Sequence, residues 1–320
     1  MTPSIDLANI EQAAHSIDSC IRQTPQYVDP SLSRHFGTDI LIKIESVNVL
    51  RSFKGRGADF FMKSVESNQP VVTASAGNFG QAIAWAGAAR GIDVRVFAAE
   101  NANPRKIDRM RALGARISLE GHDFDAAKDA AREFAERHSG ARFVEDGRDP
   151  AISEGAGTIG YELAGENLDT LLVPVGNGAL VSGVGAWFKA HSPKTRVIGV
   201  VAGSAPSMAL SWEQGAQVCA PVSTIADGIA IRVPVPAALD WMKETVDLVV
   251  KVSESSILRA LMLIRDLAGL LLEPAAAVGI AALIENPELR SGRVGTIFTG
   301  SNFSTEIAAV LRDSPSVNCN

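Results

Sequence analysis

The chain has 320 residues, of which 46% are hydrophobic and 21% charged, so it can bury a hydrophobic core without disulfide or metal staples. Its net charge of −6 and its lack of Lys/Arg runs argue against a nucleic-acid-binding surface. The cysteines, Cys20, Cys219 and Cys319, are widely spaced and suit a reducing compartment. Residues 1–11 show no signal-peptide pattern and no apolar run is long enough to cross a membrane, which predicts a soluble, cytoplasmic protein.

Short apolar runs alternate with helical patterns along the whole chain. Strands are predicted at 41–44, 71–73, 94–97, 114–119, 170–175, 196–201, 246–252 and 293–298. Helices are predicted at 79–90, 104–113, 124–138 and 180–190, and from 255 and 274 onward. This alternation predicts an α/β fold with parallel sheets flanked by helices. The charged stretch 145–150 is the clearest break, and two lobes with a cleft between them are the simplest arrangement.

The first motif places a lysine between an aromatic residue and two glycines, in the stretch Ser52-Phe53-Lys54-Gly55-Arg56-Gly57. An extended segment gives way to a helix at this point. A lysine held near apolar groups loses its proton more easily than a surface lysine, and a neutral amine attacks aldehydes to form an imine. The alternative, a surface lysine at a helix N-terminus, is disfavoured because that end of a helix repels cations.

Three turns of small residues follow, at Ser75–Gln81, Gly176–Leu180 and Thr299–Asn302. Each stands at the end of a predicted strand, where ligands bind in open α/β sheets. Backbone N–H groups in such turns converge on anions, so the turns suit a carboxylate or a phosphate. Each turn also has a purely structural interpretation, as a helix cap or a tight glycine turn. Together with one lysine, the turns favour a covalently held cofactor that carries a phosphate.

Other motifs for common enzyme classes are weak or missing. The stretch 155–160 matches the dinucleotide pattern GxGxxG, but no predicted strand leads into it and the residues after it are typical of a helix. The five histidines show no zinc-ligand spacing, and no GxSxG stretch offers the nucleophile of an α/β-hydrolase.

In combination and order, these motifs resemble those of the fold-type II pyridoxal-phosphate (PLP) enzymes, in particular the threonine/serine dehydratases and the related serine racemases. The resemblance runs from about residue 23 to residue 303 and includes two further segments, Ala226-Asp227-Gly228-Ile229-Ala230 and Leu272-Glu273-Pro274. It implies a two-lobed α/β fold like that of the tryptophan synthase β chain, with the cofactor in the interlobe cleft. It also implies a large cofactor-binding domain of residues 1–45 and 146–320, a small inserted domain of residues 46–145, and a homodimer.

The same resemblance assigns roles to individual residues. Lys54 matches the Schiff-base lysine, Asn78 the residue that contacts the phenolate oxygen of the cofactor, and Thr299 the hydroxyl that meets the pyridine nitrogen. The phosphate loop corresponds to Gly176, Asn177, Gly178, Ala179 and Leu180. The loop that binds the substrate carboxylate corresponds to Ser75, Ala76, Gly77 and Phe79.

The chain departs from the family pattern in four places. Asn177 and Ala179 replace two glycines of the phosphate loop, and Phe79 replaces a histidine in the substrate loop. Ala76 stands where the racemases carry a serine that works as the second acid/base, so elimination is favoured over racemisation. The stretch 199–202 lacks the acid that helps to hold a divalent cation in many relatives, so we expect no metal site.

The expected reaction is elimination at Cβ. A neutral hydroxyl such as Thr299 leaves the ring of PLP a weak electron sink, so a leaving group at Cβ takes the electrons away. Lys54 is placed to take the Cα proton, and the cofactor phosphate, or a group near it, to protonate the departing hydroxyl. The released enamine hydrolyses to a 2-oxo acid and ammonia. We therefore expect an L-β-hydroxy amino acid as substrate, such as threonine, serine or a bulkier relative.

Three alternatives stay open at this point: a β-replacement or threonine synthase-like enzyme, a non-catalytic protein that binds the cofactor or an amino acid, and a nicotinamide dehydrogenase. Phe79 and the segment 231–234 are compatible with either a small or an aromatic substrate side chain. No regulatory module is expected after Asn320, which favours a catabolic or specialised role over a regulated biosynthetic one.

Overall fold

The computed structural model describes residues 4–316, so Cys319 and the first three residues of the chain lie outside it. The larger of its two sheets has six strands in the order β1 (Gln26–Val28), β2 (Ile40–Ile44), β10 (Val294–Phe298), β7 (Thr170–Pro174), β8 (Arg196–Ala202) and β9 (Leu248–Val252). All neighbouring strands run parallel except β1, which is antiparallel to β2.

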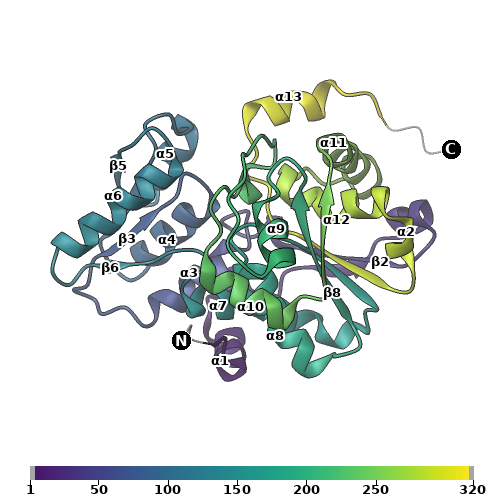
Figure 1. The fold of residues 1–320 in the computed structure, drawn as a ribbon, viewed down its shortest axis with the longest axis horizontal. Coiled ribbons are helices and arrows are strands. Elements are labelled where there is room, and N and C mark those ends of the chain that lie inside the picture. The colour runs from purple at the N-terminus through teal and green to yellow at the C-terminus, as the bar shows by residue number, and fades with distance from the viewer. Residues whose placement is uncertain (1–3, 317–320) are drawn as a thin grey trace.

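The second sheet has four parallel strands in the order β5 (Arg116–Leu119), β4 (Val94–Ala98), β3 (Val71–Ala74) and β6 (Arg142–Phe143). Three helices accompany it on the left of Figure 1: α4 (Asn78–Ala88), α5 (Pro104–Ala112) and α6 (Phe124–Arg137). The predicted α/β fold with parallel sheets flanked by helices is confirmed.

The remaining helices lie around the six-stranded sheet and between the two sheets (Figure 1). They are α1 (Leu7–Ser16), α2 (Pro30–Phe36), α3 (Lys54–Met62), α7 (Pro150–Leu163), α8 (Ala179–His191), α9 (Ser207–Gln214), α10 (Pro236–Thr245), α11 (Glu254–Leu263), α12 (Pro274–Glu285) and α13 (Thr305–Asp313). No helix within residues 4–316 has the length and apolar character needed to cross a membrane.

Every predicted strand is present, with small changes at the ends. β5 begins at Arg116 rather than at residue 114, because Gly114 adopts a left-handed turn with φ of 91°. β9 begins at Leu248 rather than at residue 246, because the N–H of Val246 still caps helix α10. The sequence analysis missed β1 and β6, which have three and two residues and are too short to show an alternating pattern.

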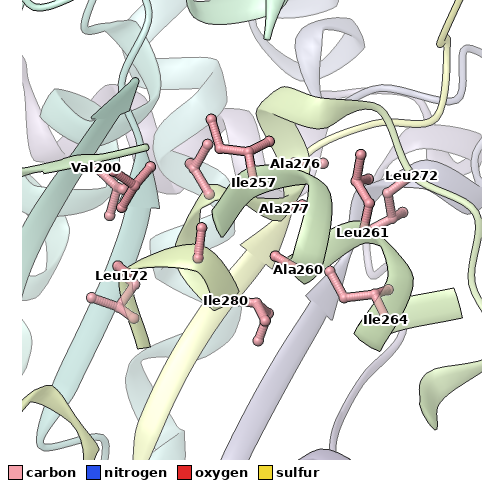
Figure 2. Close-up of a cluster of buried hydrophobic side chains, with 14 of the residues drawn as sticks. Leu172, Val200, Ile257, Ala260, Leu261, Ile264, Leu272, Ala276, Ala277 and Ile280 are labelled. Carbon is pink, nitrogen blue, oxygen red and sulfur yellow. The ribbon is translucent and has the colours of Figure 1, made fainter. Parts of the chain in front are cut away.

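Helix α12 forms the centre of the largest hydrophobic cluster. It is buried from Pro274 to Leu283, because it packs against the six-stranded sheet on one side and against α11 on the other. Figure 2 shows Ile280 and its neighbours on α12 between Leu172 of β7 and Leu261 of α11. This packing fixes Glu273, the residue just before α12, beyond the carboxyl end of β10, where its N–H donates to the carbonyl oxygen of Gly300 at 3.1 Å.

The GxGxxG stretch lies inside helix α7 and not in a strand-to-helix turn. The strand β6, which the sequence analysis did not recognise, does precede this helix, but the six residues 144–149 separate it from α7. The glycines instead let backbones meet: a Cβ at Gly155 would lie 2.5 Å from the carbonyl oxygen of Arg56, and one at Gly157 would lie 3.0 Å from that of Gly183. The stretch therefore serves helix packing, which contradicts the dinucleotide interpretation.

Gly183→Ala tests this packing. The new Cβ would lie 1.9 Å from the backbone carbonyl oxygen of Ser153, which cannot move without displacing α7. We expect the substitution to lower the free energy of unfolding by about 1–3 kcal/mol, measured by urea denaturation. Gly165→Ala is the matched control, because no atom lies within 4 Å of its Cβ position. Equal stability of the two variants would contradict the packing role.

Candidate functional site

A cavity of about 390 Å³ opens where the two sheets face each other. It lies beyond the carboxyl ends of β3, β7 and β10, the end of parallel sheets at which ligands bind. The structure brings all of the sequence-predicted site residues to the wall of this cavity: Lys54, Ser75, Ala76, Gly77, Asn78, Phe79, Gly176, Asn177, Gly178, Ala179, Leu180 and Thr299.

Lys54 is the first residue of α3, and its backbone is tied to the end of β10. The N–H of Phe53 donates to the carbonyl oxygen of Thr299 at 3.0 Å, and Ser52 forms a bridge with Gly300. The lysine side chain is 15% exposed, and its Nζ lies 4.7 Å from the ring centre of Phe53. The aromatic surroundings expected from the sequence are therefore present.

The sequence analysis missed the carboxylate that faces this lysine. Lys54 Nζ donates to Asp146 Oδ2 at 2.6 Å, so the amine is held in an ion pair and not among apolar groups alone. Asp146 lies 92 residues further along the chain, in the loop between β6 and α7. No local pattern in the sequence connects the two residues, and only the fold brings them together.

The turn Gly176–Leu180 leads from β7 into helix α8, whose 13 residues start at Ala179. The N-cap residue, Gly178, has φ of 90° and offers no side-chain cap. The free N–H groups of a helix N-terminus, together with the helix dipole, attract anions. This end of α8 is therefore a suitable phosphate site, even with Asn177 and Ala179 in place of glycines.

A second helix N-terminus without a side-chain cap lies on the same cavity. Helix α4 begins at Asn78, and its N-cap is Gly77. The side chains of Ser75 and Asn78 do not cap the helix, contrary to the structural alternative, because Ser75 Oγ accepts from the N–H of Gly77 at 3.1 Å. This end of α4 is suited to a second anion, such as a carboxylate.

Asn78 is fixed at both ends of its amide group. Its Nδ2 donates to Glu273 Oε1 at 2.9 Å, and its Oδ1 accepts from Asn302 Nδ2 at 2.8 Å. Glu273 also accepts from the backbone N–H of Asn302 at 3.1 Å. The sequence analysis quoted Glu273 only as part of a matching segment, so its role as a support for Asn78 is new.

Burial changes the acidity of Glu273. Desolvation raises the pKa of this carboxyl from 4.5 to about 7, and the negative charge of Asp227 acts in the same direction. The hydrogen bonds from Asn78 and Asn302 oppose the rise, because they favour the ionised form.

Two ion pairs lie at or beside the cavity, each joining a helix next to the four-stranded sheet to a segment that follows β8. Lys106 of α5 forms an ion pair with Asp227, which precedes the buried Ile229. Arg232 pairs with Asp125 at the start of α6, at 2.5 Å. Within residues 4–316, no group of three or more His, Cys, Asp or Glu side chains could hold a metal ion.

Comparisons with known proteins agree with this geometry. The family described as "Pyridoxal-phosphate dependent enzyme" matches residues 17–300. The chain is 34% identical to the L-threonine ammonia-lyase of Thermotoga maritima over 95% of this chain and 77% of that one. It superposes on threonine deaminase isoform 2 of Solanum lycopersicum with a TM-score of 0.88, at 30% identity, over 95% and 92% of the two chains. Maize serine racemase gives a TM-score of 0.89 at 25% identity, over 96% of each chain.

The raised pKa of Glu273 predicts a pH-dependent stability. Because the folded protein holds this proton more tightly, the contribution of Glu273 to stability is complete below about pH 4.5 and is lost as the pH rises to about 7. In Glu273→Gln this loss should disappear, so between about pH 4.5 and about pH 7 the thermal midpoint of the variant should rise relative to that of the wild type. The exposed Glu288→Gln is the control. A constant difference in midpoint between Glu273→Gln and the wild type would contradict the assignment.

Proposed function

Because this chain belongs to the pyridoxal-phosphate dependent enzymes, we propose that it is an ammonia-lyase that removes the β-hydroxyl of an L-β-hydroxy amino acid such as threonine or serine. The products are a 2-oxo acid and ammonia. One observation carries the proposal: a single cavity holds the amine of Lys54 and two helix N-termini that no side chain caps. These are partners for an aldehyde, a phosphate and a substrate carboxylate.

The residues of the cavity fit PLP. No side chain caps the N-terminus of α8. There is no room for a side chain at Gly178, because a Cβ there would lie 2.8 Å from the Cβ of Ala238. When bound, PLP supplies the electron sink that lets a bond at Cα break. We assign its phosphate to the turn Gly176–Leu180, its phenolate oxygen to Asn78 and its ring nitrogen to Thr299.

In this proposal, the loop that precedes α4 holds the substrate. The N-terminus of α4, with Ser75, Ala76 and Gly77, binds the carboxylate, and Phe79 lies beside it on the cavity wall. Lys54 removes the Cα proton. Ala76 has no group that moves a proton on the opposite face of Cα, which supports elimination over racemisation.

We also propose a homodimer in the cytoplasm. Three exposed apolar residues, Val47, Val49 and Leu271, support self-association. Val47 and Val49 follow Ser46, whose carbonyl oxygen accepts from Ser301, and Leu271 precedes Glu273, whose N–H donates to Gly300. Because residues 300 and 301 contact both segments, the three apolar side chains belong to neighbouring parts of the surface. Cys20 and Cys219 are free thiols, which is consistent with a reducing compartment. The division into residues 1–45 with 146–320 and an inserted 46–145 stays a prediction, supported by the four-stranded sheet lying wholly within residues 71–143.

The first test is release of ammonia and 2-oxo acid by the purified, PLP-loaded protein. The substrates are L-threonine, L-serine, L-threo-phenylserine and hydroxyaspartate. Lys54→Ala should lose both turnover and the absorbance of the lysine–PLP bond, whereas Lys63→Ala, an exposed lysine next to the end of α3, should keep both. Turnover by Lys54→Ala would contradict the assignment of Lys54 as the PLP-binding lysine. A lysine–PLP absorbance without release from any substrate would instead favour β-replacement.

The phosphate site is tested by Gly178→Ala. The backbone there has φ of 90° and the new Cβ would crowd Ala238, so the end of α8 must shift away from its anion. We expect the affinity for PLP to fall at least about tenfold, or about 1.4 kcal/mol, in a spectroscopic titration. Gly215→Ala is the control, since it has φ of 69° but nothing within 4 Å. Equal losses of affinity in both variants would argue against a phosphate at α8.

A further inference from the structure

We propose that Asp146 is the positioning residue for Lys54, and that its carboxylate stabilises the ammonium group formed when Lys54 takes the Cα proton of the substrate. The proposal rests on the proposed role of Lys54 and adds a residue to which neither the motifs nor the comparisons assign a function.

The contact is short and protected from solvent. Asp146 Oδ2 lies 2.6 Å from Lys54 Nζ, and the Asp146 side chain is 11% exposed. Its other oxygen, Oδ1, is buried and has no hydrogen-bond partner in the described part of the chain. A buried carboxylate with so few partners costs stability, and such costs are typical of functional sites.

The preceding residue shows that the position of Asp146 is not a general property of its loop. Glu145 turns away from Lys54 and forms salt bridges with Arg132 at 2.8 Å and Lys128 at 3.5 Å. It stabilises the loop against α6, whereas Asp146 lines the cavity. Adjacent acids thus have separate partners, and only one of them faces the reacting amine.

The loop is also pressed against the proposed phosphate site. Gly147 has φ of 82°, and a Cβ there would lie 2.2 Å from the carbonyl oxygen of Asn177. The N–H of Arg148 donates to the carbonyl oxygen of Glu145 at 3.1 Å, which closes the turn. Asp146 is therefore held between α3 and the start of α8, with little freedom to leave Lys54.

The remaining charges on the cavity wall are engaged elsewhere. Lys106 and Asp227 pair with each other, and Glu273 accepts from Asn78 and Asn302. Asp146 is thus the carboxylate that sets the charge around Lys54 Nζ.

In the proposed step, the proton moves from the Cα of the substrate to Nζ of Lys54. Lys54 enters the step as a free amine, the Cα–H bond breaks, and a new N–H bond forms on Nζ, while the electron pair stays on the substrate. Asp146 remains a carboxylate throughout. Its charge favours the new ammonium over the amine, and its hydrogen bond keeps Nζ pointed at the cavity.

The test compares Asp146→Asn with Glu145→Gln in the PLP-loaded protein. Asn keeps the size of the side chain and removes its charge. In Asp146→Asn we expect the lysine–PLP absorbance to persist, but the pH midpoint at which its protonated form is lost should fall by about one unit or more. We also expect kcat to fall at least about tenfold with KM within about twofold, and the isotope effect of Cα-deuterated substrate to rise. Glu145→Gln should lower stability without moving the pH midpoint.

A second variant separates charge from shape. Asp146→Glu keeps the carboxylate, so its pH midpoint should stay near that of the wild type even if kcat falls. Equal shifts in Asp146→Glu and Asp146→Asn, or no shift and an unchanged kcat in Asp146→Asn, would overturn the proposal and leave the role of Lys54 intact. Loss of the proposed function itself would show differently, as a lysine–PLP absorbance that survives in Lys54→Ala.

Discussion

The site depends on one packing constraint, the backbone-to-backbone contact of α7 with both α3 and α8. Gly155 of α7 meets the backbone of Arg56, and Gly183 of α8 meets that of Ser153 on the other side of α7. Helix α3 begins with Lys54, and α8 begins just after the proposed phosphate turn. Because α7 packs closely against both, Lys54 and the proposed phosphate turn keep a fixed separation.

A buried charge cluster holds the same region in register. Arg56, two residues after Lys54, is fully buried and pairs with Glu45 at 2.9 Å and with Glu162 of α7 at 2.6 Å. Lys43 of β2 joins Glu162 from the six-stranded sheet. Burial alone would lower the pKa of Arg56 and raise that of Glu162, but the pairs outweigh it, so the pKa of Arg56 is raised, that of Glu162 is lowered, and both charges persist in the interior. Replacing one member alone would leave an unpaired buried charge, which is costly. The cluster therefore fixes the start of α3, where Lys54 lies.

Whether a feature of the fold or of the site could be predicted from the sequence depends on how far apart its residues lie along the chain. The apolar run from Leu171 to Val175 predicted strand β7, and the turns at Ser75–Gln81 and Gly176–Leu180 were also predictable, because these signals are local. The pairing of Lys54 with Asp146, and that of Asn78 with Glu273, joins residues 92 and 195 positions apart. No periodicity encodes such pairs. The glycines of α7 match a nucleotide pattern because close helix packing and a nucleotide turn call for the same residue, and the sequence analysis discounted the match from the helical residues that follow it.

Two ion pairs near the cavity differ in kind from the contacts at Lys54 and Asn78. The pairs Lys106–Asp227 and Arg232–Asp125 join the helices beside the four-stranded sheet to segments that follow β8. Asp227 is 58% exposed and Arg232 50%, so each pair is solvated and contributes little to stability. The hydrogen bonds of Lys54 and Asn78, the residues proposed to hold the cofactor, are instead partly buried and short, at 2.6 and 2.9 Å. The contacts between the two parts of the cavity wall are therefore of two kinds, solvated ion pairs that are weak and short hydrogen bonds at Asn78 that are shielded from water.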